Sequence, residues 1–108
     1  MREFVVNQEN FHQEIEKQKK PVLLVFWCYG DTLCMKQRII ASRLAREQDL
    51  FDVGSVCCNE EPYIANLFRL GRGKLPAVIL MQRGSARCGK HHFMSRDEIM
   101  KMVSKFIK

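Results

Sequence analysis

The chain has 108 residues, of which 46% are hydrophobic and 28% are charged, and its formal net charge at pH 7 is +6. These values are typical of one globular domain, and we expect a single domain over residues 1–108. No apolar run approaches the roughly 20 residues that cross a bilayer, and no apolar leader follows Met1, so a cytoplasmic protein without membrane contact is expected. Nucleic-acid binding is not expected either, because no basic stripe interleaved with aromatic residues is present; the positive charge favours acidic partners.

The first half of the chain contains the segment with the strongest pattern. A short strand is predicted at residues 4–6, and Asn10 is expected to be the N-cap of a helix that ends before Pro21. Residues 22–28 form an unbroken apolar run, which is typical of a strand buried on both faces. After a break at 29–32, apolar residues recur at helical spacing to about residue 49. Asp31 and Cys34 therefore lie at a helix N-terminus beside the carboxyl end of a central strand, where open α/β sheets place their sites.

The second half predicts three more strands and two helices. Strands are expected at 53–58, 77–82 and 85–90, the last two joined by a tight turn at 83–84. A short helix is expected to start at residues 60–62, with Ile64, Leu67 and Phe68 on its apolar face. Another is expected to start at Ser95, whose capping box uses Glu98. The element order is βαβαβαββα. We therefore predict an α/β fold with a mixed central sheet and helices on both faces.

Five cysteines, an odd number without an export signal, indicate thiols rather than a disulfide framework. Adjacent Cys57 and Cys58 lie in a strand and point to opposite faces, which predicts one core residue and one surface neighbour. Cys88 is expected to be an incidental thiol of the hairpin. Cys28 and Cys34 lack the spacing of a zinc knuckle, so neither a metal nor another cofactor is expected.

Across essentially its whole length the chain resembles the thioredoxin family. The resemblance rests on Phe26-Trp27 before the helix-entry turn, Cys34 in the first helical turn, Leu75-Pro76 before a strand, and Gly84 in the hairpin. It implies a thioredoxin-like fold and a site for thiol–disulfide exchange. It also implies that Pro76 is the family's cis-proline, beside a groove that binds extended peptides.

The chain departs from the family at three functional positions. Asp31 replaces the attacking cysteine, so that the motif is Asp31-Thr32-Leu33-Cys34 and only the resolving cysteine, Cys34, is retained. Val25 occupies the position of the family's buried aspartate, and His92 that of a small glycine that borders the groove. The resemblance therefore implies an atypical Asp-x-x-Cys site without the usual two-cysteine shuttle.

Three candidate residues carry the possible thiol chemistry. Cys34 is the candidate working thiol, because amide groups and the helix dipole at a helix N-terminus favour a thiolate. Asp31 opposes this through its negative charge and is equally explained as an N-cap of the helix. Cys28 is a candidate partner of Cys34 in a displaced dithiol, provided that the intervening turn brings the two sulfur atoms together.

Two functions follow. In the first, Cys34 alone forms mixed disulfides with protein or small thiols and relies on an external thiol for resolution. In the second, the chain is a redox-inactive module that binds a protein or peptide through the groove expected around Trp27, Tyr29, Gly30, Leu75, Pro76 and His92. His91 and His92 are expected in a strand, pointing to opposite faces, so they would not share a metal ion, although an ion pair between His92 and Asp31 is conceivable. The sequence specifies neither the partner nor the oligomeric state.

Overall fold

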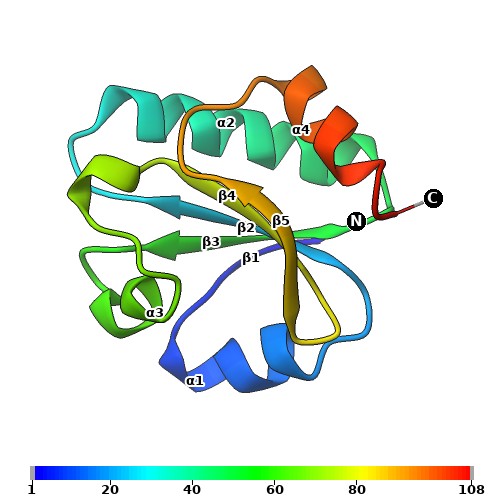
Figure 1. Ribbon diagram of the computed structural model, residues 1–108, viewed down its shortest axis with the longest axis horizontal. Coiled ribbons are helices and arrows are strands. Elements are labelled where there is room, and N and C mark those ends of the chain that lie inside the picture. The colour runs from blue at the N-terminus through cyan, green and yellow to red at the C-terminus, as the bar shows by residue number, and fades with distance from the viewer. Residues whose placement is uncertain (1, 108) are drawn as a thin grey trace.

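The structure is a computed structural model and describes residues 2–107, the side chain of Arg72 excepted. A five-stranded mixed sheet lies at its centre, with helices on both faces (Figure 1), which confirms the predicted α/β class. The elements, in chain order, are β1 (Glu3–Val5), α1 (Gln8–Phe11) with a π-helical continuation (His12–Glu16), β2 (Val22–Trp27), α2 (Thr32–Glu47), β3 (Asp52–Cys57), α3 (Pro62–Leu67), a 3₁₀ turn (Arg72–Lys74), β4 (Ala77–Gln82), β5 (Ser85–Lys90) and α4 (Arg96–Val103).

The sheet has the order β1-β3-β2-β4-β5. Strands β1, β3 and β2 are parallel to one another, whereas β4 runs antiparallel to β2, and β5 antiparallel to β4. Strand β2 is therefore central, and five of its six residues are buried. That burial on both faces explains why β2 is apolar throughout rather than alternating.

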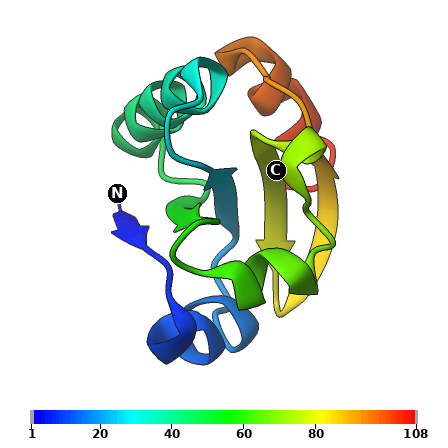
Figure 2. The same cartoon turned by 90° about the vertical axis from the view of Figure 1, so that its left-hand side faces the viewer.

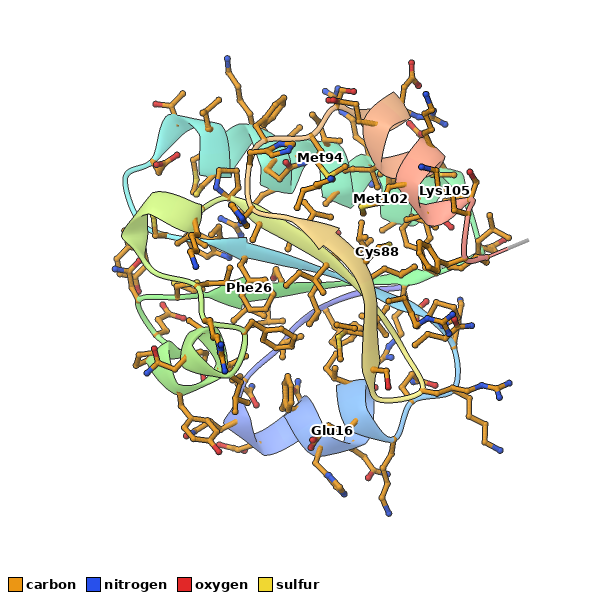
Figure 3. All side chains as sticks on the ribbon, viewed as in Figure 1. Glu16, Phe26, Cys88, Met94, Met102 and Lys105 are labelled. Carbon is orange, nitrogen blue, oxygen red and sulfur yellow. The ribbon has the colours of Figure 1, made fainter. Side chains whose placement is uncertain are left out.

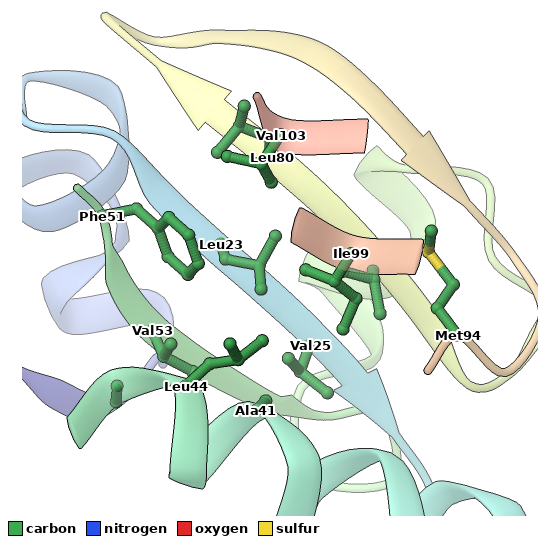
Figure 4. Close-up of a cluster of buried hydrophobic side chains, with 12 residues drawn as sticks. Leu23, Val25, Ala41, Leu44, Phe51, Val53, Leu80, Met94, Ile99 and Val103 are labelled. Atoms are coloured by element: carbon green, nitrogen blue, oxygen red, sulfur yellow. The ribbon is translucent and has the colours of Figure 1, made fainter. Parts of the chain in front are cut away.

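Two apolar clusters cover the two faces of the sheet. Helices α2 and α4 lie over one face, and α1 and α3 lie over the other (Figures 1 and 2). Under α2 and α4, Leu23 and Val25 of β2 pack with Leu44 and Ile99, as Figure 4 shows. On the opposite face, Phe26 packs toward α3 and its ring centroid lies 5.0 Å from that of Phe68 (Figure 3). The two clusters fix β2, and with it the loop that follows, between two packed layers.

A buried glutamine joins α2 to the loop before α4. Gln37 is fully buried; its Nε2 donates to the carbonyl oxygen of Met94 over 3.0 Å, and its Oε1 accepts from the amide of Met94 over 2.7 Å. The side-chain amide therefore satisfies both backbone polar groups of one residue inside the core. The sequence analysis did not single out this residue, because a polar position on an apolar helix face gives no indication of its partner.

The beginning of α1 corrects one prediction. The N-cap is Asn7, not Asn10: Asn7 Oδ1 accepts from the Asn10 amide over 3.0 Å, and Asn10 Oδ1 accepts from the Asn7 amide over 2.9 Å. The two asparagines form a reciprocal capping box, in which the second one lies inside the helix. By contrast, the predicted capping box of Ser95 and Glu98 at α4 is confirmed.

Two further predictions differ from the structure. Leu67, expected on the apolar face of α3, is 51% exposed, because the short helix turns only Ile64 and Ala65 fully toward the core. His91 and His92 lie in a bend after β5 rather than in a strand. Pairing of β5 with β4 ends at Lys90, opposite Val78, so no neighbouring strand continues the ladder beyond that point. None of the described helices combines the length and apolarity that crossing a bilayer requires.

Candidate functional site

The structure brings Cys28 and Cys34 together at one edge of the sheet. Cys28 follows the last residue of β2, Cys34 lies in the first turn of α2, and their Sγ atoms are 4.0 Å apart. The turn between them contains Gly30, whose φ of +71° lies in the left-handed region that glycine adopts without steric cost. The turn thus brings the two sulfur atoms close together, which is the condition that a displaced dithiol requires.

The two thiols differ in exposure. Cys34 is fully buried, whereas Cys28 is half-buried and lines an open cleft. Burial raises the pKa of the Cys34 thiol to about 12; the Cys28 backbone opposes this by hydrogen bonding, whereas the Cys28 side chain and the negative charge of Asp31 raise the pKa further. Because the thiolate is the reactive form, Cys34 is poorly suited to attack a substrate that arrives from solvent.

This difference predicts selective alkylation. Iodoacetamide at neutral pH should label Cys28 well before Cys34 in the reduced native protein, because Cys34 is both inaccessible and protonated. Mass mapping of a time course measures the order, and urea-unfolded protein, in which both thiols should react, is the control. Rapid native labelling of Cys34 would restore the view that this thiol works alone.

Asp31 caps helix α2, as the sequence analysis predicted. Its backbone is extended, with φ −101° and ψ 119°, and its Oδ1 accepts from the Cys34 amide over 2.9 Å. One of the unpaired amides at the helix start is thereby satisfied, and the carboxylate sits favourably at the positive end of the helix dipole. Asp31, which stands where the resemblance to the thioredoxin family places the attacking cysteine, thus has a structural role.

Substitutions of Asp31 can separate its role as the N-cap of α2 from the effect of its negative charge. Asp31→Ala should lower the free energy of unfolding by about 0.5–2 kcal/mol, whereas Asp31→Asn and Asp31→Ser should cost little, because each keeps an oxygen acceptor for the Cys34 amide. Urea denaturation of the four proteins measures this. Equal stability of the alanine and asparagine variants would contradict a capping role.

A cleft of about 520 Å³ opens beside the thiol pair. Its walls come from the loops after β2 and β3, from α3, and from the segment before β4; the lining residues are Cys28, Tyr29, Asp31, Cys58, Asn59, Pro62, Ala65, Asn66, Leu70, Gly71 and Leu75. Among the described side chains that line it, none is a lysine or an arginine. The only charged group among these described side chains is the Asp31 carboxylate, although the chain as a whole carries a net positive charge.

The loop after β2 is held by hydrogen bonds to the loop after β3. The amide of Tyr29 donates to Asn59 Oδ1 over 2.7 Å, and the Tyr29 hydroxyl donates to Glu60 Oε2 over 2.6 Å. The bond to Glu60 raises the pKa of the Tyr29 phenol, since ionisation would place two negative charges together. The ring of Tyr29 is nevertheless 57% exposed, so this side chain is fixed at one end and accessible at its face.

Trp27 lies next to this loop, and the guanidinium group of Arg38 lies over its ring. Its ring centroid is 5.9 Å from that of Tyr29, and the guanidinium carbon of Arg38 lies 3.9 Å from the Trp27 centroid. Such a contact between a cation and an aromatic face stabilises both side chains. Trp27 is thus partly covered by α2, which leaves Tyr29 as the more accessible aromatic residue of the predicted groove.

The Leu75–Pro76 peptide bond is cis, as the resemblance implied. Leu75 lines the same cleft as Cys28 and Asp31, whereas Pro76 is buried behind it. The structure thus gathers five of the predicted site residues, Cys28, Tyr29, Asp31, Cys34 and Leu75, around the cleft or directly beneath it.

His92 does not join this group. It is exposed, and its Nδ1 donates to the carbonyl oxygen of Phe93 over 3.0 Å. At the start of α4, hydrogen bonds from the amide and hydroxyl of Ser95 lower the pKa of Glu98, and His92 makes a smaller electrostatic contribution in the same direction. No hydrogen bond or ion pair links His92 to Asp31 among the described residues. The conceivable pairing is absent because the bend after β5 directs His92 toward α4.

The other cysteines occupy different environments. Cys57 is buried and Cys58 is half-buried, as predicted, but Cys58 does not belong to the strand, because β3 ends at Cys57 and Cys58 begins the turn that follows. Cys58 lines the cleft, and burial raises the pKa of its thiol to about 11, with Cys28 contributing. Cys88 lies half-buried on β5, packed against the cluster under α4, away from the thiol pair (Figure 3).

The sequence analysis missed the side of the cleft formed after β3. Asn59 and Glu60, which hold Tyr29, and Cys58, which lines the wall, were not among the predicted site residues. A signal existed, because strands were expected at 22–28 and 53–58, and neighbouring parallel strands place the loops after their carboxyl ends side by side. The observed register, with Trp27 opposite Cys57, has this consequence.

Comparison with known proteins assigns the chain to no family. No protein-family model matches the sequence, and no curated protein matches it significantly.

Proposed function

We propose that the chain has a thioredoxin-like fold and carries out thiol–disulfide exchange through the pair Cys28 and Cys34. The observation that carries this proposal is the distance of 4.0 Å between the two sulfur atoms, one in an open cleft and the other buried beneath it. The sheet order β1-β3-β2-β4-β5, with β4 antiparallel to the central strand β2, supports the fold assignment.

The difference in exposure assigns the two roles. Cys28 attacks, because its thiol reaches the cleft, and Cys34 resolves, because its thiol is adjacent but inaccessible to a substrate. This modifies the expectation that Cys34 acts alone. The attacking cysteine then precedes the turn, and Asp31 at the usual attacking position serves as the cap of α2.

The exchange consists of two displacements. The Cys28 thiolate attacks one sulfur of a substrate disulfide, the substrate S–S bond breaks, and the other substrate sulfur leaves as a thiolate. Cys34 then loses its proton and attacks Cys28 Sγ, which releases the second substrate thiolate and forms a Cys28–Cys34 disulfide. The substrate gains two electrons, and the protein pair loses them. The two Sγ atoms, which are 4.0 Å apart, must approach to about 2.05 Å for this disulfide to form.

The resolving step should be slow and dependent on pH. Burial raises the pKa of the Cys34 thiol, so only a small fraction of this thiol is ionised near neutral pH, and the fraction rises with pH. We therefore expect the single-turnover rate of mixed-disulfide resolution to increase steadily from pH 7 to pH 9. A rate that levels off near neutral pH would show that Cys34 ionises far more easily than its burial implies.

Turnover assays test the proposal. Dithiothreitol-driven reduction of insulin should be weak for the unmodified protein, compared with an ordinary two-cysteine thioredoxin, and should fall to background for Cys28→Ser and Cys34→Ser alike. Cys88→Ser is the matched control and should be unchanged, because Cys88 lies on a different part of the sheet. Turnover that survives Cys28→Ser would overturn the assignment of the attacking thiol.

A specific observation also favours a second candidate, a redox-inactive module that binds a protein or peptide. The exposed ring of Tyr29, fixed through Glu60, and the side chain of Leu75 line a cleft large enough for an extended segment. If this is the function, Tyr29→Ala abolishes partner binding and Cys28→Ser leaves it intact. The two candidates therefore respond to different substitutions.

A further inference from the structure

The thiol pair forms a second kind of site together with Asp31. One ligand-type atom from each of Cys28, Asp31 and Cys34 lies within 4.8 Å of the other two. Thiolate sulfur and carboxylate oxygen are both ligands of zinc, and the same sulfur-rich set suits cadmium. From this arrangement we propose that the reduced protein binds one Zn²⁺ ion, or Cd²⁺ in its place, through these three side chains.

The distances fit a tetrahedral ion. With Zn–S bonds of about 2.3 Å, two thiolates of a tetrahedral site are separated by about 3.8 Å. The observed separation of the Cys28 and Cys34 sulfur atoms is 4.0 Å. The pair therefore needs to move by only a few tenths of an ångström to bind a metal, whereas disulfide formation requires an approach of about 2 Å.

Only one of the two carboxylate oxygens of Asp31 takes part in the helix cap. Oδ1 accepts from the Cys34 amide, which fixes the carboxylate beside the buried sulfur. Its second oxygen makes no hydrogen bond or ion pair with another described group, so it can donate an electron pair to a cation. The cap thus positions a third ligand, in the way that hydrogen bonds to a coordinating carboxylate orient it in metal sites.

The electrostatic surroundings also suit a cation. The described side chains lining the cleft beside these residues include an aspartate and no lysine or arginine. Zinc binding would release the two thiol protons to solvent, leaving two thiolates and one carboxylate around a divalent ion. The cleft leaves the fourth position open to water or to an external thiol, as in zinc sites that retain an exchangeable ligand.

This inference concerns the same residues as the proposed exchange, but it does not depend on it. A dithiol that never exchanges disulfides can still bind zinc, and the two properties are measured in different experiments. If the protein has both properties, one molecule cannot have the disulfide and the metal ion at the same time, because the sulfurs of a Cys28–Cys34 disulfide are no longer thiolates. Glutathione disulfide, as the oxidant, would then release the ion.

Cadmium titration of the reduced, chelator-cleared protein tests the site. We expect one Cd²⁺ per chain, a thiolate-to-metal charge-transfer band in the ultraviolet, release of two protons, and displacement by Zn²⁺. Cys28→Ser and Cys34→Ser should each lose the tight binding. Asp31→Asn should weaken it by about tenfold or more, since even changes behind the ligands cost 10–100-fold in metal affinity.

The variants distinguish the site from adventitious thiol binding. Asp31→Asn keeps the cap of α2, so weaker binding cannot be attributed to unfolding, and urea denaturation checks this. Cys88→Ser should bind Cd²⁺ like the unmodified protein. Unchanged affinity in Asp31→Asn would remove the carboxylate from the site, and unchanged affinity in Cys28→Ser would overturn the proposal, whatever the outcome of the insulin assay.

Discussion

Cys34→Ser should trap substrates as stable mixed disulfides with Cys28. In the proposed exchange, the buried sulfur releases the substrate, so its removal stops the reaction after the first displacement. The variant is incubated with insulin whose disulfide bonds are intact, and the products are analysed by non-reducing electrophoresis and mass mapping. An insulin chain should be attached to Cys28 in most molecules. The unmodified protein should show little of this adduct, because Cys34, whose sulfur lies 4.0 Å away, resolves it.

Two controls sharpen this experiment. Cys28→Ser should form no adduct at Cys34, which is fully buried. Cys58 also lines the cleft and is the only other described thiol that does so, so the Cys34→Ser/Cys58→Ser double variant shows whether Cys58 resolves the adduct in place of Cys34. An adduct on Cys34 in the Cys28→Ser protein would contradict the assigned roles.

Gln37→Met should produce a large loss of stability. The change keeps a side chain of similar length but removes both partners of the Met94 backbone, whose amide and carbonyl would then be buried without hydrogen bonds. An unsatisfied buried polar group costs about 1–3 kcal/mol, so we expect a loss of about 2–5 kcal/mol in the free energy of unfolding.

Urea denaturation measures this loss, and Lys36→Met is the matched control. Lys36 lies one position earlier on the same helix but is exposed, so the same new side chain there should change stability by less than about 0.5 kcal/mol. A similar effect at the two positions would mean that the paired hydrogen bonds contribute little. Such a result would require the loop before α4 to rearrange and find other partners.

The features predicted correctly from the sequence depend on residues that lie close together in the chain. The unbroken apolar run of β2 indicated a strand buried on both faces, and Asp31 could be identified as a cap because the capped amide lies only three residues away. Asn10 was misassigned because two asparagines three residues apart can each cap, and only their reciprocal hydrogen bonds distinguish them. Local rules thus located α1 but placed its first residue wrongly.

The site was less predictable because it depends on how distant segments meet. The approach of Cys28 to Cys34 requires the specific path of the turn at Gly30, which spacing alone does not define. The contact of Tyr29 with Glu60 spans 31 positions and follows from the pairing of β2 with β3. Similarly, the orientation of His92 depends on where β5 stops pairing with β4.

The most direct test of the account is oxidation of the native protein in graded mixtures of reduced and oxidised glutathione, followed by peptide mass mapping. The account predicts that Cys28 and Cys34 disappear together as one intramolecular disulfide, while Cys57, Cys58 and Cys88 remain thiols. If Cys28 instead ends as a glutathione adduct, or is linked to Cys58, while Cys34 remains a free thiol, then the two sulfurs do not work as a pair.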